Sequence, residues 1–266
     1  MSQTPLPARS VPPSLSVTLP PSPPAGSPRY FALLYTQANL RPLLRALLAL
    51  ADEISAGGAR GLDHSVAHLR LEWWRGEAER FARGEPQHQW LRALLAQHPA
   101  SRGLDLQPLV QAAALDLATQ TLGAPSGVAL PGAKLQGAVF ELAADALRPD
   151  RHTDPLSPQL QRTLRGLGER VLELERFAAG GAATVSAPAA PAAALEALRR
   201  QAAAIDAAWL PQLAPLLVWS ALAAAQARRR ARRPDRNRGS MFDGFADNML
   251  AWNTARRAVR GLIRID

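Results

Sequence analysis

The sequence predicts an all-α protein built from closely packed helices. Apolar residues make up 47% of the chain and aromatic residues only 5%, so alanine and leucine must fill most of the interior. Both residues favour helices, and β-branched residues are sparse. Apolar side chains recur at spacings of three and four residues between short Gly- and Pro-containing breaks. With 266 residues, the chain is long enough to bury a large core.

The first 28 residues differ in composition from the rest. They are rich in Pro, Ser and Thr and have no apolar periodicity, which is typical of a disordered or polyproline-like tail. No apolar segment of signal-peptide length follows a basic start, so we expect a cytoplasmic protein without a signal peptide. Residues 29–266 are predicted to form one helical domain. The Gly-, Ala- and Pro-rich stretch at residues 179–193 is a candidate flexible break.

The first three predicted helices have clear limits. Asn39 can cap the first helix, and Gly57 and Gly58 end it. Asp63 caps the second, and Gly84 and Pro86 break the chain before the third, which carries Trp90 and Leu91. The apolar side chains of the second helix predict one core-facing stripe, formed by Val66, Leu69, Trp73, Ala78 and Phe81.

Six further helices follow, for a total of nine. Their periodic apolar stretches are separated by Gly, Pro or small residues, and they cover residues 106–122, 131–147, 157–178, 194–208, 213–233 and 245–263. The uncharged run at residues 207–227 is long enough to cross a bilayer, and arginines follow it. Pro211, Pro215 and several alanines would insert weakly, so we interpret this run as a buried core helix.

Two stretches carry a family resemblance. Residues 35–57 read YTQANLRPLLRALLALADEISAG, and residues 68–98 read HLRLEWWRGEAERFARGEPQHQWLRALLAQH. Together they resemble the N-terminal half of the squalene/phytoene synthase family, most clearly over residues 29–98 and less so to residue 147. The resemblance implies an isoprenoid-synthase-like helical bundle around a central apolar cavity. Enzymes of that family join two prenyl diphosphates. In them, carboxylates four residues apart on the first helix hold Mg²⁺, and the resemblance implies the same arrangement here.

The acidic residues depart from that family pattern. The first helix offers only Asp52 and Glu53, which are adjacent and therefore point about 100° apart. Glu141 and Asp145 do lie four residues apart, close to where the family's second acidic motif falls, but the Gly-Arg-x-Tyr-x-Pro that follows in the family is missing. These four acids are the candidate metal ligands, and the pattern indicates degenerate metal sites.

Other residues of these stretches are candidate substrate contacts. Arg41 and Arg45 lie one turn apart and are suited to face a diphosphate. Trp73 and Arg75 match the family's Trp-Arg pair. The alternatives are core packing for the tryptophans and a surface ion pair with Glu79 for Arg75.

Two more groupings have the spacing of metal ligands. His64, His68 and Glu72 share one helical stripe, as a transition-metal site would require, although two solvent-facing imidazoles are the simpler interpretation. Asp243 and Asp247 are also four residues apart, and capping of the last helix by one of them is the favoured role. The chain has no Cys, which excludes zinc thiolate sites and thiol nucleophiles.

Positive charge gathers at the C-terminal end. Residues 228–266 hold eleven arginines and four acids, so they carry +7 of the net charge of +9. Arg228, Arg229, Arg230, Arg232 and Arg233 follow an apolar helix, an arrangement that suits an anionic membrane surface. Nucleic acid is a less favoured partner, because no aromatic residues are interleaved with these arginines.

The leading hypothesis is a squalene/phytoene synthase-like protein with degenerate metal sites. It would be a non-catalytic binding or assembly protein, peripheral at the inner face of a membrane. Its partner would be a prenyl-type lipid or another protein, and we expect no cofactor. One alternative is a divergent prenyl transferase that uses Mg²⁺ with Asp52, Glu53, Glu141 and Asp145. A second alternative is a basic nucleic-acid-binding adaptor.

Overall fold

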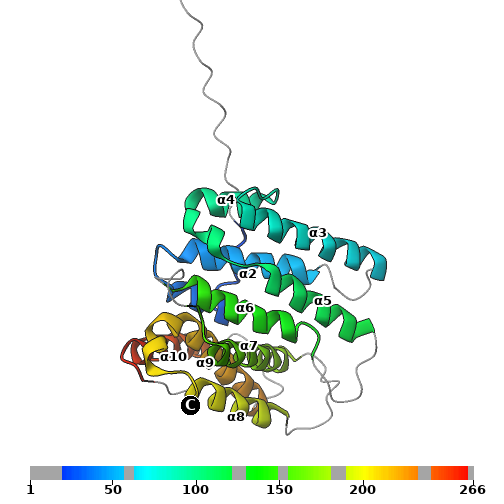
Figure 1. Cartoon of the computed structure of the whole chain (residues 1–266). Coiled ribbons are helices and arrows are strands. Elements are labelled where there is room, and N and C mark those ends of the chain that lie inside the picture. Colours follow the sequence, from blue (N-terminus) through cyan, green and yellow to red (C-terminus); the bar gives the residue numbers. More distant parts are fainter. Residues whose placement is uncertain are drawn as a thin grey trace, which may run out of the picture.

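The all-α prediction is confirmed. The computed structural model describes residues 20–56, 63–121, 130–148, 155–180, 190–232 and 241–262, and these contain ten α-helices, two 3₁₀ helices and no strand (Figure 1). The α-helices are α1 (Pro28–Leu34), α2 (Arg41–Ala56), α3 (His64–Arg83), α4 (Gln89–Gln97), α5 (Gln107–Thr121), α6 (Ala133–Ala146), α7 (Pro158–Ala178), α8 (Ala190–Ala203), α9 (Leu210–Arg232) and α10 (Met241–Val259). The 3₁₀ helices are η1 (Pro99–Gly103) and η2 (Ala207–Trp209).

Helix α7 lies at the centre of the packing. It contacts α6, α8 and α9, while α6 also packs against α2 and α5, and α9 also packs against α1 and α10. Figure 1 shows α3 and α4 at one end of this stack of helices, with α8, α9 and α10 towards the other end. One large cluster of buried leucines and alanines runs through the helices and forms the core.

Several helix ends follow from capping side chains. The Asp63 carboxylate accepts the N–H of Ser65 at 2.8 Å and caps α3, as predicted. Gly84 ends the same helix in the left-handed conformation, with φ of 87°, which glycine adopts without a steric penalty. The Ser157 hydroxyl caps α7 by accepting the N–H of Leu160.

Two helices differ from the predicted pattern. Helix α1 was not predicted, because its seven residues are too short to show a periodicity; Ser27 caps it and Pro28 occupies its first turn. Helix α8 covers Ala190–Ala203 rather than residues 194–208. It ends early because Asp206 accepts the N–H of Ala208 and starts the η2 turn that leads into α9. Residues 1–19 of the predicted tail and 181–189 of the predicted break lie outside the described residues.

The predicted core face of α3 is wrong in its first half. Val66, Leu69 and Trp73 are exposed, Leu69 at 71% of its surface. The buried stripe is instead formed by Ala67, Leu71, Trp74, Ala78 and Phe81. Helix α3 carries large apolar residues on two adjacent stripes, so the sequence alone does not show which one is buried. The buried stripe begins with a small residue, Ala67, and is therefore the less apparent of the two.

Helix α9 has the composition of a membrane span but is mostly buried within the protein. It is the one described helix long and apolar enough to cross a bilayer, and 72% of its most apolar window is covered by other parts of the chain. Trp219 and Leu222 are fully buried between α9 and its neighbours. This burial agrees with the interpretation of residues 207–227 as a core helix.

Two glycines allow α6 and α7 to cross at backbone contact. A Cβ atom added to Gly168 would lie 2.5 Å from the carbonyl oxygen of Gln136 and 3.0 Å from the Cα atom of Gly137. A Cβ atom added to Gly137 would lie 2.9 Å from the carbonyl oxygen of Arg165. These obstacles are backbone atoms, so they can move only if the helices separate.

We therefore predict that Gly168→Ala lowers the free energy of unfolding by about 1–3 kcal/mol, the usual effect of overpacking. Gly244→Ala in α10 is the matched control, because nothing lies within 4 Å of its added Cβ. The control should raise stability by about 0.5–1 kcal/mol, since alanine favours helices. Urea unfolding measures both effects; equal stability of the two variants would contradict the close crossing.

Candidate functional site

A polar cluster joins five helices, namely α1, α2, α6, α7 and α9. Arg29 of α1 pairs with Asp52 of α2, with 2.5 Å between Nη1 and Oδ1, and its Nη2 lies 3.4 Å from Oε1 of Gln136 in α6. The same guanidinium lies 5.2 Å from the ring centroid of Trp219 in α9. The Trp219 indole N–H donates to Glu175 of α7 at 2.7 Å.

The Glu175 carboxyl is the perturbed acid of this cluster. Removal from water raises the pKa of the Glu175 carboxyl, and the nearby charge of Asp52 raises it further. The hydrogen bond from Trp219 and the charge of Arg29 act in the opposite direction. The Nε2 atom of Gln136 is buried without a hydrogen-bond partner. The cluster thus extends from the exposed carboxylate of Asp52 to the buried side chains of Gln136 and Trp219.

Most of this cluster was missed from the sequence. Arg29 directly follows the Pro-rich segment and belongs to no recognisable motif. Glu175, Gln136 and Trp219 lie in helices where each residue, taken alone, fits an ordinary surface or core position. Only Asp52 was among the candidate residues.

The adjacent acids of α2 have separate partners. Asp52 pairs with Arg29, whereas Oε2 of Glu53 lies 3.2 Å from Nε2 of His88, the residue before α4. His88 sits among tryptophan rings, with centroid distances of 5.1 Å to Trp74 and 5.2 Å to Trp90. The two carboxylates therefore face different elements.

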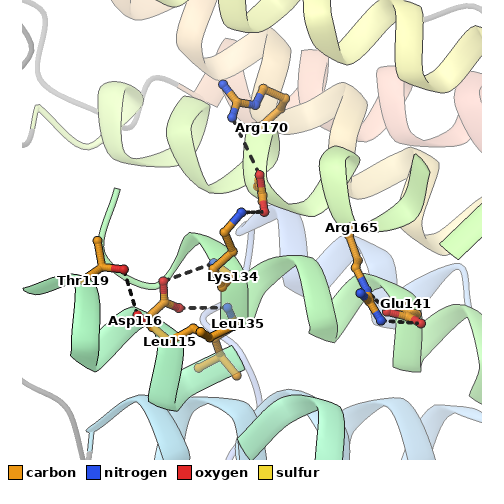
Figure 2. Close-up of polar contacts among 9 residues, drawn as sticks. Leu115, Asp116, Thr119, Lys134, Leu135, Glu141, Arg165 and Arg170 are labelled. Atoms are coloured by element: carbon orange, nitrogen blue, oxygen red, sulfur yellow. Dashed lines mark hydrogen bonds and ion pairs between the residues drawn. The ribbon is translucent and has the colours of Figure 1, made fainter. Parts of the chain in front are cut away.

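Glu141 and Asp145 are also separated by their partners. Arg165 of α7 binds the Glu141 carboxylate through two nitrogens, with 3.1 Å between Nη2 and Oε1 (Figure 2). The hydrogen bond to Glu141 raises the pKa of the Arg165 guanidinium, so Arg165 keeps its charge at neutral pH. Asp145 pairs with Arg148, three residues further along the chain.

The residues present do not fit a magnesium clamp. Each of the four candidate acids contacts a basic side chain, namely Arg29, His88, Arg165 or Arg148. Within the described ranges, no three His, Asp or Glu side chains come close enough together to hold a metal ion. Magnesium requires several oxygen ligands converging on one point.

The histidine stripe of α3 also lacks a third ligand. The Nε2 atoms of His64 and His68 lie 2.9 Å apart, so the two rings contact each other. Glu72 pairs with Arg75 instead of joining them. This pair also replaces the predicted contact between Arg75 and Glu79.

Arg41 and Arg45, the candidate diphosphate contacts, donate hydrogen bonds to backbone oxygens of the N-terminal segment. Arg41 donates to the carbonyl oxygens of Leu34 and Thr36 at 3.1 and 3.2 Å, where α1 ends. Arg45 donates to the carbonyl oxygen of Pro20. Both guanidinium groups therefore bind backbone oxygens. Trp73 is exposed at the surface and contacts Trp74 edge to face.

Two buried acids have structural roles. Glu77 is fully buried, pairs with Arg80 and accepts the N–H groups of Gln87 and His88 at 2.8 and 2.7 Å. Asp116 of α5 accepts the N–H groups of Lys134 and Leu135 and so holds the start of α6 (Figure 2). Burial raises the pKa of the Asp116 carboxyl.

The arginine cluster begins in the last turn of α9. Arg229 pairs with Asp247 of α10, at 2.5 Å between Nη2 and Oδ1, and Arg232 is exposed. Asp247 is thus a buried partner within α10 and not its cap, while Asp243 lies in the first turn of that helix. Arg228 and Arg230 are half-buried, and Arg233 lies outside the described residues.

No family model, curated protein or solved structure matches the chain. The resemblance to the squalene/phytoene synthase family remains a prediction from the residues of α2, α3 and α4.

We predict that Glu175→Gln changes the pH dependence of stability. A raised pKa means that the folded protein holds this proton more tightly than the unfolded chain does. The contribution of Glu175 to the free energy of unfolding is therefore fully present below pH 4.5, the ordinary pKa of a glutamate. It is lost as the pH rises through the raised pKa of the folded protein. The Gln variant does not lose this stability, because its amide oxygen accepts the hydrogen bond from the Trp219 N–H and the amide does not ionise.

Urea unfolding at several pH values measures the difference. The variant should gain stability relative to the native chain as pH rises from 4 to 8. Glu79→Gln, which removes an exposed acid of α3, is the control for the loss of one negative charge. A difference between variant and native chain that does not change with pH would show that the pKa of the Glu175 carboxyl is not raised in the folded protein.

Proposed function

We propose that the chain is a non-catalytic squalene/phytoene synthase-like protein that acts by binding or assembly at a membrane face. The observation that carries this proposal is the engagement of all four candidate metal ligands by basic side chains. Ionisation of a prenyl diphosphate requires divalent cations that stabilise the leaving pyrophosphate. Carboxylates already engaged by basic side chains do not offer such a site.

The directions of these ion pairs strengthen the proposal. Asp52 is held towards α1 by Arg29, and Glu141 is held towards α7 by Arg165. To bind one diphosphate–metal complex, both ion pairs would have to break and the carboxylates would have to turn towards each other. The bidentate pair of Glu141 is the costlier one to break, because two charge-assisted hydrogen bonds would be lost.

Packing at the centre favours binding through an outer surface. Trp219 and Phe140 are fully buried, and their ring centroids lie 4.9 Å apart between α9 and α6. Arg29 and Glu175 occupy the adjoining space. A long prenyl chain would have to displace these side chains, whereas a protein partner or a membrane can use the exposed helix faces.

We predict no release of pyrophosphate when the purified chain is incubated with Mg²⁺ and farnesyl or geranylgeranyl diphosphate. A coupled pyrophosphate assay against a protein-free blank measures this. Turnover that Asp145→Ala abolishes and that Glu79→Ala leaves intact would overturn the proposal in favour of a divergent prenyl transferase. Glu79 is the matched acid, because it is an exposed carboxylate on α3.

A further inference from the structure

Helix α10 turns its large apolar side chains away from the protein. Phe242 and Phe245 expose 83% and 68% of their surface, and Met249, Trp252 and Val259 are also exposed. These five residues, here called the outer face of α10, follow one another at intervals of three, four, three and seven residues. Such spacing places them on one side of the helix, over a length of about 26 Å at 1.5 Å per residue.

The side of α10 that packs on α9 has the opposite composition. Its buried positions are small or polar, namely Asp247, Ala251, Thr254, Ala255 and Ala258. Small residues let α10 lie close against α9, and the pair between Asp247 and Arg229 fixes their register. A helix on the surface of a globular protein ordinarily shows the reverse arrangement, with its apolar stripe towards the core. The outer face is therefore suited to a second apolar environment.

The charges around this outer face are positive. Arg256, Arg257 and Arg260 are exposed near its C-terminal half, and the guanidinium of Arg256 lies 5.1 Å from the ring centroid of Trp252. The two acids of α10 do not offset them, because Asp247 is buried against Arg229 and Asp243 is partly buried. Arg232 at the end of α9 adds another exposed positive charge.

We propose that the outer face of α10 is a docking surface for an anionic lipid bilayer. Phe, Met and Trp side chains would enter the boundary between headgroups and acyl chains, and the arginines would contact lipid phosphates. Tryptophan is suited to this depth because its ring is apolar and its N–H is polar. Arginine can keep its stem on the apolar layer while its charged end reaches the phosphates.

Charge favours a bilayer over a second copy of the chain. Two copies pairing through this face would bring two arginine clusters, each on a chain of net charge +9, close to each other. Like charges at an interface oppose association. Anionic lipid instead offers the opposite charge and an apolar layer in one surface. The location at a membrane comes from the proposed function, on which this inference rests. What is new is the surface of the protein that contacts the membrane.

Vesicle flotation with the full chain tests this surface. We expect the chain to float with vesicles of equal parts phosphatidylcholine and phosphatidylglycerol, and to float weakly with phosphatidylcholine alone. Phe242→Ser with Phe245→Ser should lower the partition coefficient about tenfold or more, since two large apolar side chains no longer insert. Arg256→Gln with Arg260→Gln should lower it roughly tenfold and reduce its dependence on salt.

The matched control is Val66→Ser with Leu69→Ser. It also removes two exposed apolar residues, but from α3, at the other end of the stack in Figure 1. This control should float as the native chain does. All substituted side chains are exposed, so circular dichroism and thermal unfolding should match those of the native chain.

Three results would overturn the proposal. The first is flotation of the Phe242/Phe245 variant as strong as that of the native chain, which would leave the membrane setting intact and remove α10 from it. The second is a native chain that does not float with the phosphatidylglycerol-containing vesicles, or that floats equally with both lipid compositions. The third is a native dimer, seen by sedimentation, that the same variant converts to monomers without any vesicle binding. Pyrophosphate release is measured separately, so turnover in a chain that floats through α10 would reject only the non-catalytic function.

Discussion

Pairing of carboxylates with basic side chains is the interaction on which the functional interpretation of this bundle depends. Asp52, Glu53, Glu141 and Asp145 are the candidate metal ligands predicted from the sequence, and each contacts a basic side chain. A carboxylate oxygen shared with a guanidinium is a weaker ligand for a divalent cation, because the cation must first displace that partner. The pairs of Asp52, Glu53 and Glu141 link α2 or α6 to another element, whereas the pair of Asp145 with Arg148 is local to the end of α6.

The crossing of α6 and α7 connects the fold to these pairs. Gly137 and Gly168 bring the two backbones into contact, and at this distance Arg165 of α7 reaches Glu141 of α6 with both nitrogens. Five residues before Glu141, Gln136 reaches the polar cluster where Arg29 and Trp219 meet. A wider crossing would weaken the contact between Arg165 and Glu141. The pair of Glu141 and Arg165 is thus a consequence of how closely α6 and α7 pack.

Much of the fold could be predicted from the sequence, because its helix limits have local causes. Asp63 and Ser157 cap helices through their own side chains, and Gly84 ends one through its backbone. The outward direction of α10 could not be predicted in this way. Met249, Trp252 and Val259 form a periodic stripe that resembles a core face, and only the structure places the alanine-rich side against α9. The same ambiguity led to the wrong core face for α3.

The candidate site was less predictable, because its partners are distant in the sequence. Arg29 and Gln136 are 107 residues apart, and no local pattern indicates that they meet. Calorimetric titration of Mg²⁺ in the presence of a non-hydrolysable farnesyl diphosphate analogue tests the central claim most directly. We expect no saturable binding of Mg²⁺ that depends on the protein. Two or more bound ions, lost in Glu141→Gln and Asp145→Asn, would show that these carboxylates exchange their arginines for metal and would contradict the non-catalytic interpretation.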